Sequence, residues 1–260
     1  MTLGKHRLVV YNVCEFIKTF MNNGGISVII PVYNECRTIS TILEIVKLWG
    51  KAQEIIVVDD GSTDKTVQAV SRIASVNLIS YKKNQGKGYA LTAGIKKSHG
   101  SVLMFLDGDM LGLTRADLDE IVNPMIRGQA DMVLGLARFW SAGSFEPFND
   151  LTGIRVVKKD IIENLLTRIS ASGYGVELIL NNAHKHLRIV RVPLEHVYIL
   201  GKLEKQKMSD AALTYVKEAR ELMTETIRQQ SKMMSPRARD ILKNIVKYLK
   251  LTMEVLQQPL

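Results

Sequence analysis

The chain has 260 residues, of which 46% are apolar, and its formal net charge at pH 7 is +9. This apolar fraction is enough for a large core and excludes a disordered chain, while only two cysteines exclude a disulfide scaffold. The positive charge favours anionic partners, but without a long basic run we expect no nucleic-acid partner. With no signal peptide and no apolar stretch long enough to span a bilayer, we expect a cytoplasmic protein.

Strands are predicted to alternate with helices in the first half of the chain. Residues 1–25 form a leader with helical spacing of apolar residues, which ends at an Asn-Asn-Gly-Gly stretch. Such alternation indicates βαβ units and a parallel sheet, whose ligands gather at the carboxyl ends of its strands. The predicted strands are 26–31, 54–58, 76–81 and 102–106, and the predicted helices are 38–49, 64–73 and 88–97.

The second half is less regular and ends in helices. We expect strands at 132–136 and 187–192, a loop over 139–153, and helices at 159–169 and 176–185. From about residue 204 the pattern is all-helical, and Pro236 divides it. The predicted organisation is a leader over 1–25, an α/β domain over 26–203 and a helical extension over 204–260.

The predicted strand 102–106 is wholly apolar and ends on Asp107, Gly108 and Asp109. Two acids at the end of a buried strand are costly unless a cation pairs with them. Mg²⁺ and Mn²⁺ prefer oxygen ligands and share their shell with substrate phosphates. The triplet therefore predicts a metal-diphosphate site, and the alternative is a polar turn.

Two further polar motifs follow predicted strands. In "VDDGSTD", Asp60, and with less support Asp59, could accept a hydrogen bond from a nucleotide, or the segment could be a turn in which Ser62 or Asp64 caps the next helix. In "NQGKGYALTAG", Lys87 could meet a phosphate. Leu91 stands where a dinucleotide fingerprint has its third glycine, so we do not expect a Rossmann dinucleotide site.

The segment "PVYNE" follows the first predicted strand. Glu35 alone could be explained by its place in the first turn of a helix, where the dipole favours an acid. That explanation leaves out Tyr33 and Asn34, which reach the same edge of the sheet as the other motifs. We therefore expect this segment to contribute to the same ligand site.

In this order, "ISVIIPVYNE", "EIIVVDDGSTD", "NQGKGYAL" and "VLMFLDGDM" resemble the family-2 glycosyltransferases of the GT-A fold, over residues 26 to about 200. The segments "LGLARF", "NDLTGIRVVKKD" and "GYGVEL" are most similar to polyprenyl-phosphate sugar transferases of the dolichol-phosphate-mannose-synthase type, and second to glucosyl-3-phosphoglycerate synthases. The resemblance implies an α/β GT-A fold, a mixed Rossmann-like sheet flanked by helices with a helical C-terminal tail. It also implies a UDP- or GDP-linked sugar donor.

The resemblance also implies roles for individual residues. Asp107 and Asp109 would hold Mg²⁺ or Mn²⁺, and His196 is a candidate third ligand because Leu111 stands where related enzymes often have a polar one. The alternative for His196 is a structural histidine. Taking motifs and resemblance together, the expected donor-binding residues are Pro31, Tyr33, Asn34, Glu35, Asp60, Lys87, Asp107 and Gly108. The expected catalytic acids are Asp109, Glu177 and Asp150, and the expected phosphate- or acceptor-binding residues are Arg138 and Arg155.

Each of three implied roles has a plainer alternative. Glu177 could be an ordinary acid at the start of a helix, and Arg138 and Arg155 could be ordinary surface arginines. Guanidinium groups nevertheless suit phosphate oxygens.

The expected class of acceptor depends on whether its nucleophile needs a general base. A phosphate, with its second pKa at about 6, needs no strong base, whereas a hydroxyl would need Asp150 or Glu177 as base. We expect transfer to a phosphate-bearing acceptor, first a polyprenyl phosphate. The alternatives are a small soluble acceptor such as 3-phosphoglycerate, or a nucleotide-sugar-binding protein without turnover.

The predicted helix over 238–256 carries an apolar stripe beside lysines: Leu242, Ile245, Val246, Leu249, Met253 and Leu256. A basic amphipathic helix predicts peripheral contact with the cytoplasmic face of a membrane. The alternative is a helix that packs on the catalytic domain or in a homodimer.

Overall fold

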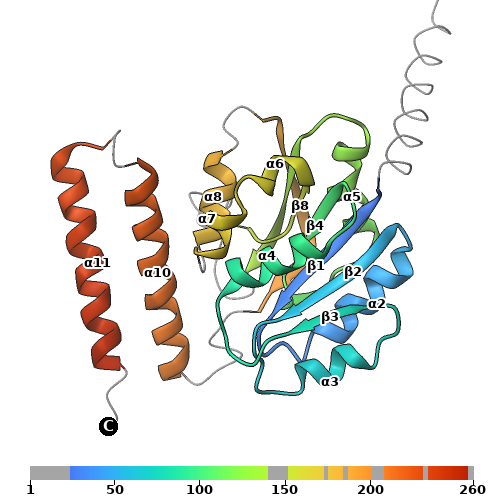
Figure 1. Cartoon of the computed structure of the whole chain (residues 1–260), viewed down its shortest axis with the longest axis horizontal. Coiled ribbons are helices and arrows are strands. Elements are labelled where there is room, and N and C mark those ends of the chain that lie inside the picture. Colours follow the sequence, from blue (N-terminus) through green and yellow to red (C-terminus); the bar gives the residue numbers. More distant parts are fainter. Residues whose placement is uncertain are drawn as a thin grey trace, which may run out of the picture.

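A computed structural model of the chain describes residues 24–139, 152–172, 175–183, 187–200, 208–230 and 234–256 (Figure 1). The predicted leader helix and most of the predicted loop over 139–153 lie outside these residues, as does Asp150. The side chain of Arg138 also lies outside the description. Predictions on these segments remain predictions.

The described residues form one mixed sheet of eight strands in the order β3-β2-β1-β4-β7-β6-β8-β5. Strands β1 to β4 run parallel, β7 is antiparallel to both β4 and β6, and β6 is parallel to β8. This is the mixed α/β sheet that the motifs predicted. The strands are β1 (Ile26–Val32), β2 (Ala52–Asp59), β3 (Asn77–Ser80), β4 (Val102–Phe105), β5 (Met110–Leu111), β6 (Met132–Phe139), β7 (Arg155–Lys158) and β8 (Ile189–Ile199).

Helices cover both faces of the sheet, so β1 is buried on each side. Val28 and Ile30 pack in the core cluster that includes helices α2 and α5, and Ile29 packs in the cluster that includes α4, α7 and α8. This two-sided burial explains why the parallel strands are almost continuously apolar. The helices are α2 (Ile39–Trp49), α3 (Thr66–Ser71), α4 (Lys87–Lys97), α5 (Arg115–Ile126), α6 (Lys159–Glu163), α7 (Leu166–Ser170), α8 (Val176–Ala183), α10 (Met208–Gln230) and α11 (Pro236–Leu256).

The predicted helix over 159–169 is wrong in its length, because the structure has two short helices there, α6 and α7. Helix α5 was not predicted, although its N-terminus is well defined. Thr114 and Asp117 form a capping box, in which each side chain accepts a hydrogen bond from the other residue's backbone amide.

The C-terminal helices α10 and α11 lie side by side at one end of the molecule, and α10 also contacts α8 (Figure 1). Helix α11 begins at Pro236, the residue predicted to divide the tail and two residues before the predicted start of the helix. Its described stripe residues, such as Leu242 and Ile245, are half-buried, whereas Ile241 and Tyr248 are 52% and 70% exposed. The stripe is therefore partly covered, which fits the packing interpretation of this helix. Within the described part of the chain, no helix has both the length and the apolarity needed to cross a membrane.

Candidate active site

The loops that follow β1, β2 and β4 meet at one edge of the sheet, because these strands are parallel neighbours. Hydrogen bonds join the loops to one another. The Thr38 hydroxyl donates to the Gly108 carbonyl at 2.6 Å, and the backbone amide of Asn34 donates to Ser62 Oγ at 2.9 Å. Asn34 has a left-handed backbone (φ 60°), and its side-chain oxygen accepts from the Thr63 amide at 2.8 Å. The structure thus brings the "PVYNE", "DDGSTD" and "DGD" motifs together.

Asp60 shapes the loop that leads to Lys87. Its side chain accepts hydrogen bonds from the Gln85 and Gly86 amides at 2.8 and 2.7 Å, and the residue is only 3% exposed. Burial raises the pKa of Asp60, and the two amide donors oppose this effect. The described contacts of Asp60 are therefore structural, and its contact with a nucleotide remains a prediction.

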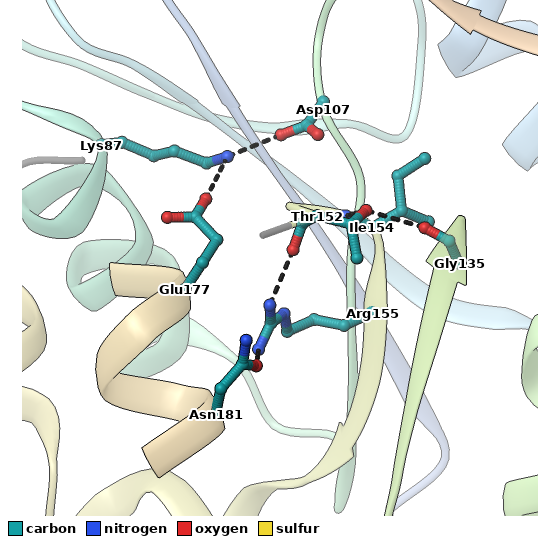
Figure 2. Close-up of polar contacts among 8 residues, drawn as sticks. All are labelled: Lys87, Asp107, Gly135, Thr152, Ile154, Arg155, Glu177 and Asn181. Carbon is teal, nitrogen blue, oxygen red and sulfur yellow. Dashed lines mark hydrogen bonds and ion pairs between the residues drawn. The ribbon is translucent and has the colours of Figure 1, made fainter. Parts of the chain in front are cut away.

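Lys87, Asp107 and Glu177 form a cluster of charged side chains at this edge, which we call the Lys87 cluster (Figure 2). The Lys87 ammonium lies 2.8 Å from Asp107 Oδ1 and 2.8 Å from Glu177 Oε1. Burial alone would lower the pKa of Lys87, but the two carboxylates outweigh burial and hold this pKa above its ordinary value. The ammonium is therefore charged at neutral pH and offsets the repulsion between the two acids.

The ion pair between Lys87 and Glu177 forms a bridge between the N-terminal ends of two helices. Lys87 is the first residue of α4, and Glu177 lies in the first turn of α8. The N-terminus of a helix favours an acid, so the position of Glu177 is also locally stable. The side chains of the cluster are 10–20% exposed, which leaves a limited opening to ligands.

The segment Thr152–Ile154 closes over the Lys87 cluster, and sequence reasoning missed its role. The Thr152 hydroxyl donates to the Gly135 carbonyl at 2.7 Å, which ties the segment to β6. A Cβ on Gly153 would lie 2.5 Å from Lys87 Nζ and directly against the Asp107 carboxylate. Only glycine allows the backbone to approach the cluster this closely.

Arg155 is 1% exposed, so the alternative of a surface arginine is wrong. Its guanidinium donates to the Thr152 carbonyl at 2.7 Å and to Asn181 Oδ1 at 3.2 Å (Figure 2). Asn181 lies one turn beyond Glu177 on α8. Arg155 therefore joins the segment over the Lys87 cluster to the helix that carries Glu177, and its contact with an anionic ligand remains a prediction.

We expect Arg155→Lys to lower the free energy of unfolding by about 1–3 kcal/mol, because one ammonium cannot reproduce the guanidinium contacts and leaves a buried acceptor unpaired. Urea denaturation measures the change. Arg72→Lys, at an exposed arginine, is the matched control and should have almost no effect. Equal stability of Arg155→Lys and the control would contradict the internal role of Arg155.

The structure does not bring His196 into a ready-made metal cluster. His196 is exposed on β8, and its carbonyl lies beside Gly112, whereas the Leu200 amide donates to the carbonyl of Asp109. Among the described residues, no group of three or more His, Cys, Asp or Glu side chains could hold a metal ion. His196 as a third ligand therefore remains a prediction.

Of two relatives among known proteins, one matches most of the chain and the other about a third of it. An uncharacterised glycosyltransferase of Haemophilus influenzae is 28% identical over 200 residues, which is 73% of this chain and 76% of the relative. The undecaprenyl-phosphate 4-deoxy-4-formamido-L-arabinose transferase of Pectobacterium carotovorum is 34% identical over 95 residues, 33% of this chain. That alignment spans only 29% of the relative's own length.

Solved structures share the fold at low identity. Glucosyl-3-phosphoglycerate synthase from Mycobacterium tuberculosis, in complex with Mn²⁺, UDP-glucose and phosphoglyceric acid, has a TM-score of 0.62 and 20% identity. The match covers 82% of each chain. The family profile described as "Glycosyl transferase family 2" matches residues 27–179. Because this match spans more than half of the chain, the protein belongs to glycosyl transferase family 2 and is a glycosyltransferase, as its motifs predicted.

Proposed function

We propose that this protein transfers a sugar from a nucleotide-diphosphate donor to a phosphate-bearing acceptor, with a divalent metal ion. The Lys87 cluster carries the proposal. A buried ammonium lies between two acids at the carboxyl edge of the sheet, beside the loops where such sheets bind ligands. A lysine in this position suits a ligand with phosphate charge.

The residues fit Mg²⁺ or Mn²⁺. Asp107 and Asp109 offer carboxylate oxygens and are separated by a single glycine. Such ions are commonly held by one or two carboxylates together with substrate phosphates and water. A third protein ligand is thus not required. When bound, the ion would neutralise charge on the diphosphate leaving group.

The chain's own residues would position the reactants. Lys87 would hold Glu177 in place and contribute positive charge beside the diphosphate. The Glu177 carboxylate is already engaged by Lys87, which suits an acceptor that needs no base to remove a proton. A phosphate group is such an acceptor, because its second pKa is about 6.

Two acceptors fit this chemistry, and we favour a polyprenyl phosphate. Relatives named for undecaprenyl phosphate and dolichyl phosphate support it, although each alignment covers less than two fifths of this chain. Exposed Ile241 and Tyr248 beside the lysines of α11 would suit a membrane surface. The half-buried stripe of α11 favours the second candidate, 3-phosphoglycerate, which requires no membrane.

The test is to incubate the full chain and Mn²⁺ with UDP-glucose or GDP-mannose, labelled in the sugar, and with each acceptor in turn. We expect label to enter the organic phase with undecaprenyl phosphate, as a product that mild acid cleaves. Transfer only to 3-phosphoglycerate would make the soluble acceptor correct. No transfer and no donor hydrolysis across a wider donor panel would contradict the proposed function.

Two controls keep this assay specific. Asp160→Asn changes an exposed acid on α6 and should transfer sugar as the wild type does. The fraction of protein that sediments with anionic liposomes, in the absence of acceptor, should fall as the salt concentration is raised, because part of the attraction is electrostatic. Transfer to a lipid acceptor without any sedimentation would contradict the membrane role of α11.

A further inference from the structure

Helix α10 belongs to the C-terminal extension, yet it carries a buried acid next to the site. Glu225 is 7% exposed. Its carboxylate lies 3.4 Å from an Arg168 guanidinium nitrogen on α7 and 3.8 Å from one of Arg228 on α10 itself. A buried acid with charged partners on another element indicates a specific docking contact rather than a solvated helix face.

Glu225 contacts helix α7 through Arg168 and the start of helix α8 at Gly175, and both regions lie next to residues of the Lys87 cluster. The Cβ and Cγ of Glu225 lie 3.4 and 3.5 Å from where a Cβ on Gly175 would be. Gly175 directly precedes α8, whose first turn holds Glu177.

Helix α7 in turn packs on α4, where Gly88 leaves room for the Ile169 carbonyl. Gly88 is the neighbour of Lys87. The docking contact of Glu225 thus supports the helices that carry both ends of the bridge between Lys87 and Glu177.

A second residue of α10, Lys217, acts electrostatically on Asp60. Burial raises the pKa of Asp60, and among the charges that oppose this is that of Lys217 on α10. Lys217 and Glu225 are about 12 Å apart along the helix axis. Helix α10 thus contacts α7 and the residue before α8 through Glu225, and the charge of Lys217 acts on Asp60.

We propose that α10 is a positioning element of the active site, in which Glu225 and Arg168 hold the start of α8 and so fix Glu177 relative to Lys87. This inference rests on the proposed function, since it concerns the geometry of that site. Glu225 is a positioning residue, because it touches none of the three residues of the Lys87 cluster in the described contacts.

The test compares Glu225→Gln with wild type in the full chain. The substitution keeps the size of the side chain and removes its charge. We expect kcat to fall by about 10- to 100-fold with little change in the donor KM, since a small displacement of a positioned group lowers turnover more than binding. Backbone amide exchange over residues 175–183 should quicken. Asp240→Asn, an exposed acid on α11, is the control.

Arg168→Gln serves as a second variant should Glu225→Gln fold poorly. It should reproduce the loss in kcat, and the double variant should lose little more than either single one, because both act through one contact. Unchanged kcat and unchanged exchange in both variants would overturn the inference, as would a rise in donor KM alone. If the wild type transfers no sugar, the proposed function fails, while exchange over 175–183 still supports or overturns the docking role of Glu225.

Discussion

Lys87→Met is expected to lower the free energy of unfolding by about 3 kcal/mol, because it leaves Asp107 and Glu177 without their shared cation. Both carboxylates are largely buried, so water replaces the ammonium poorly. Turnover should fall by at least about 100-fold, since a preorganised positive charge beside the diphosphate is lost. Urea denaturation and donor turnover measure the two effects.

Two further variants make this result specific. Lys82→Met removes an exposed lysine nearby and should change neither stability nor turnover. Lys87→Met combined with Glu177→Gln removes one of the two unpaired acids, so it should recover part of the lost stability but none of the turnover. Lys87→Met with the stability of Lys82→Met would show that the bridge seen between α4 and α8 contributes nothing.

Asp109→Asn is expected to abolish measurable turnover in Mn²⁺, a loss of at least about 100-fold, while the fold stays intact. The amide keeps the size of the side chain and removes its charge, and Asp109 is only half-buried, in the loop between β4 and β5. Steady-state kinetics at saturating Mn²⁺ measure the loss. Circular dichroism confirms folding, with Asp160→Asn as the matched control. Near-wild-type activity of Asp109→Asn would remove Asp109 from the site.

The parallel half of the sheet could be predicted because each strand is short, apolar and bounded by a helix. Strands β5 and β7 could not be predicted, because they have only two and four residues and depend on pairing with other strands. Strand β5 pairs with β8, and β7 pairs with β4 and β6. Helix α5 does have a signal in the sequence, the spacing of Thr114 and Asp117 that is typical of a helix N-terminus.

The residues of the site likewise divide into those that local sequence could predict and those that depend on distant contacts. Asp107 and Asp109 follow a strand end and Lys87 lies in a glycine-rich turn, so the local sequence was sufficient to predict their place at this edge of the sheet. The internal role of Arg155 was not accessible, because its partners Thr152 and Asn181 lie on a loop and a helix whose placement depends on the whole fold. The likeness of "NDLTGIRVVKKD" to related enzymes was the available signal for that region.

In the proposed function, this edge of the sheet binds a nucleotide-diphosphate sugar through a divalent ion held by Asp107 and Asp109. Calorimetric titration of UDP-glucose and GDP-mannose into the full chain, in Mn²⁺ and in EDTA, tests it most directly. We expect at least one donor to bind in Mn²⁺, to bind at least about tenfold more weakly in EDTA, and to show the same weakening with Asp109→Asn in Mn²⁺. Equal donor affinity in Mn²⁺ and EDTA, or no binding of any nucleotide sugar under either condition, would contradict it.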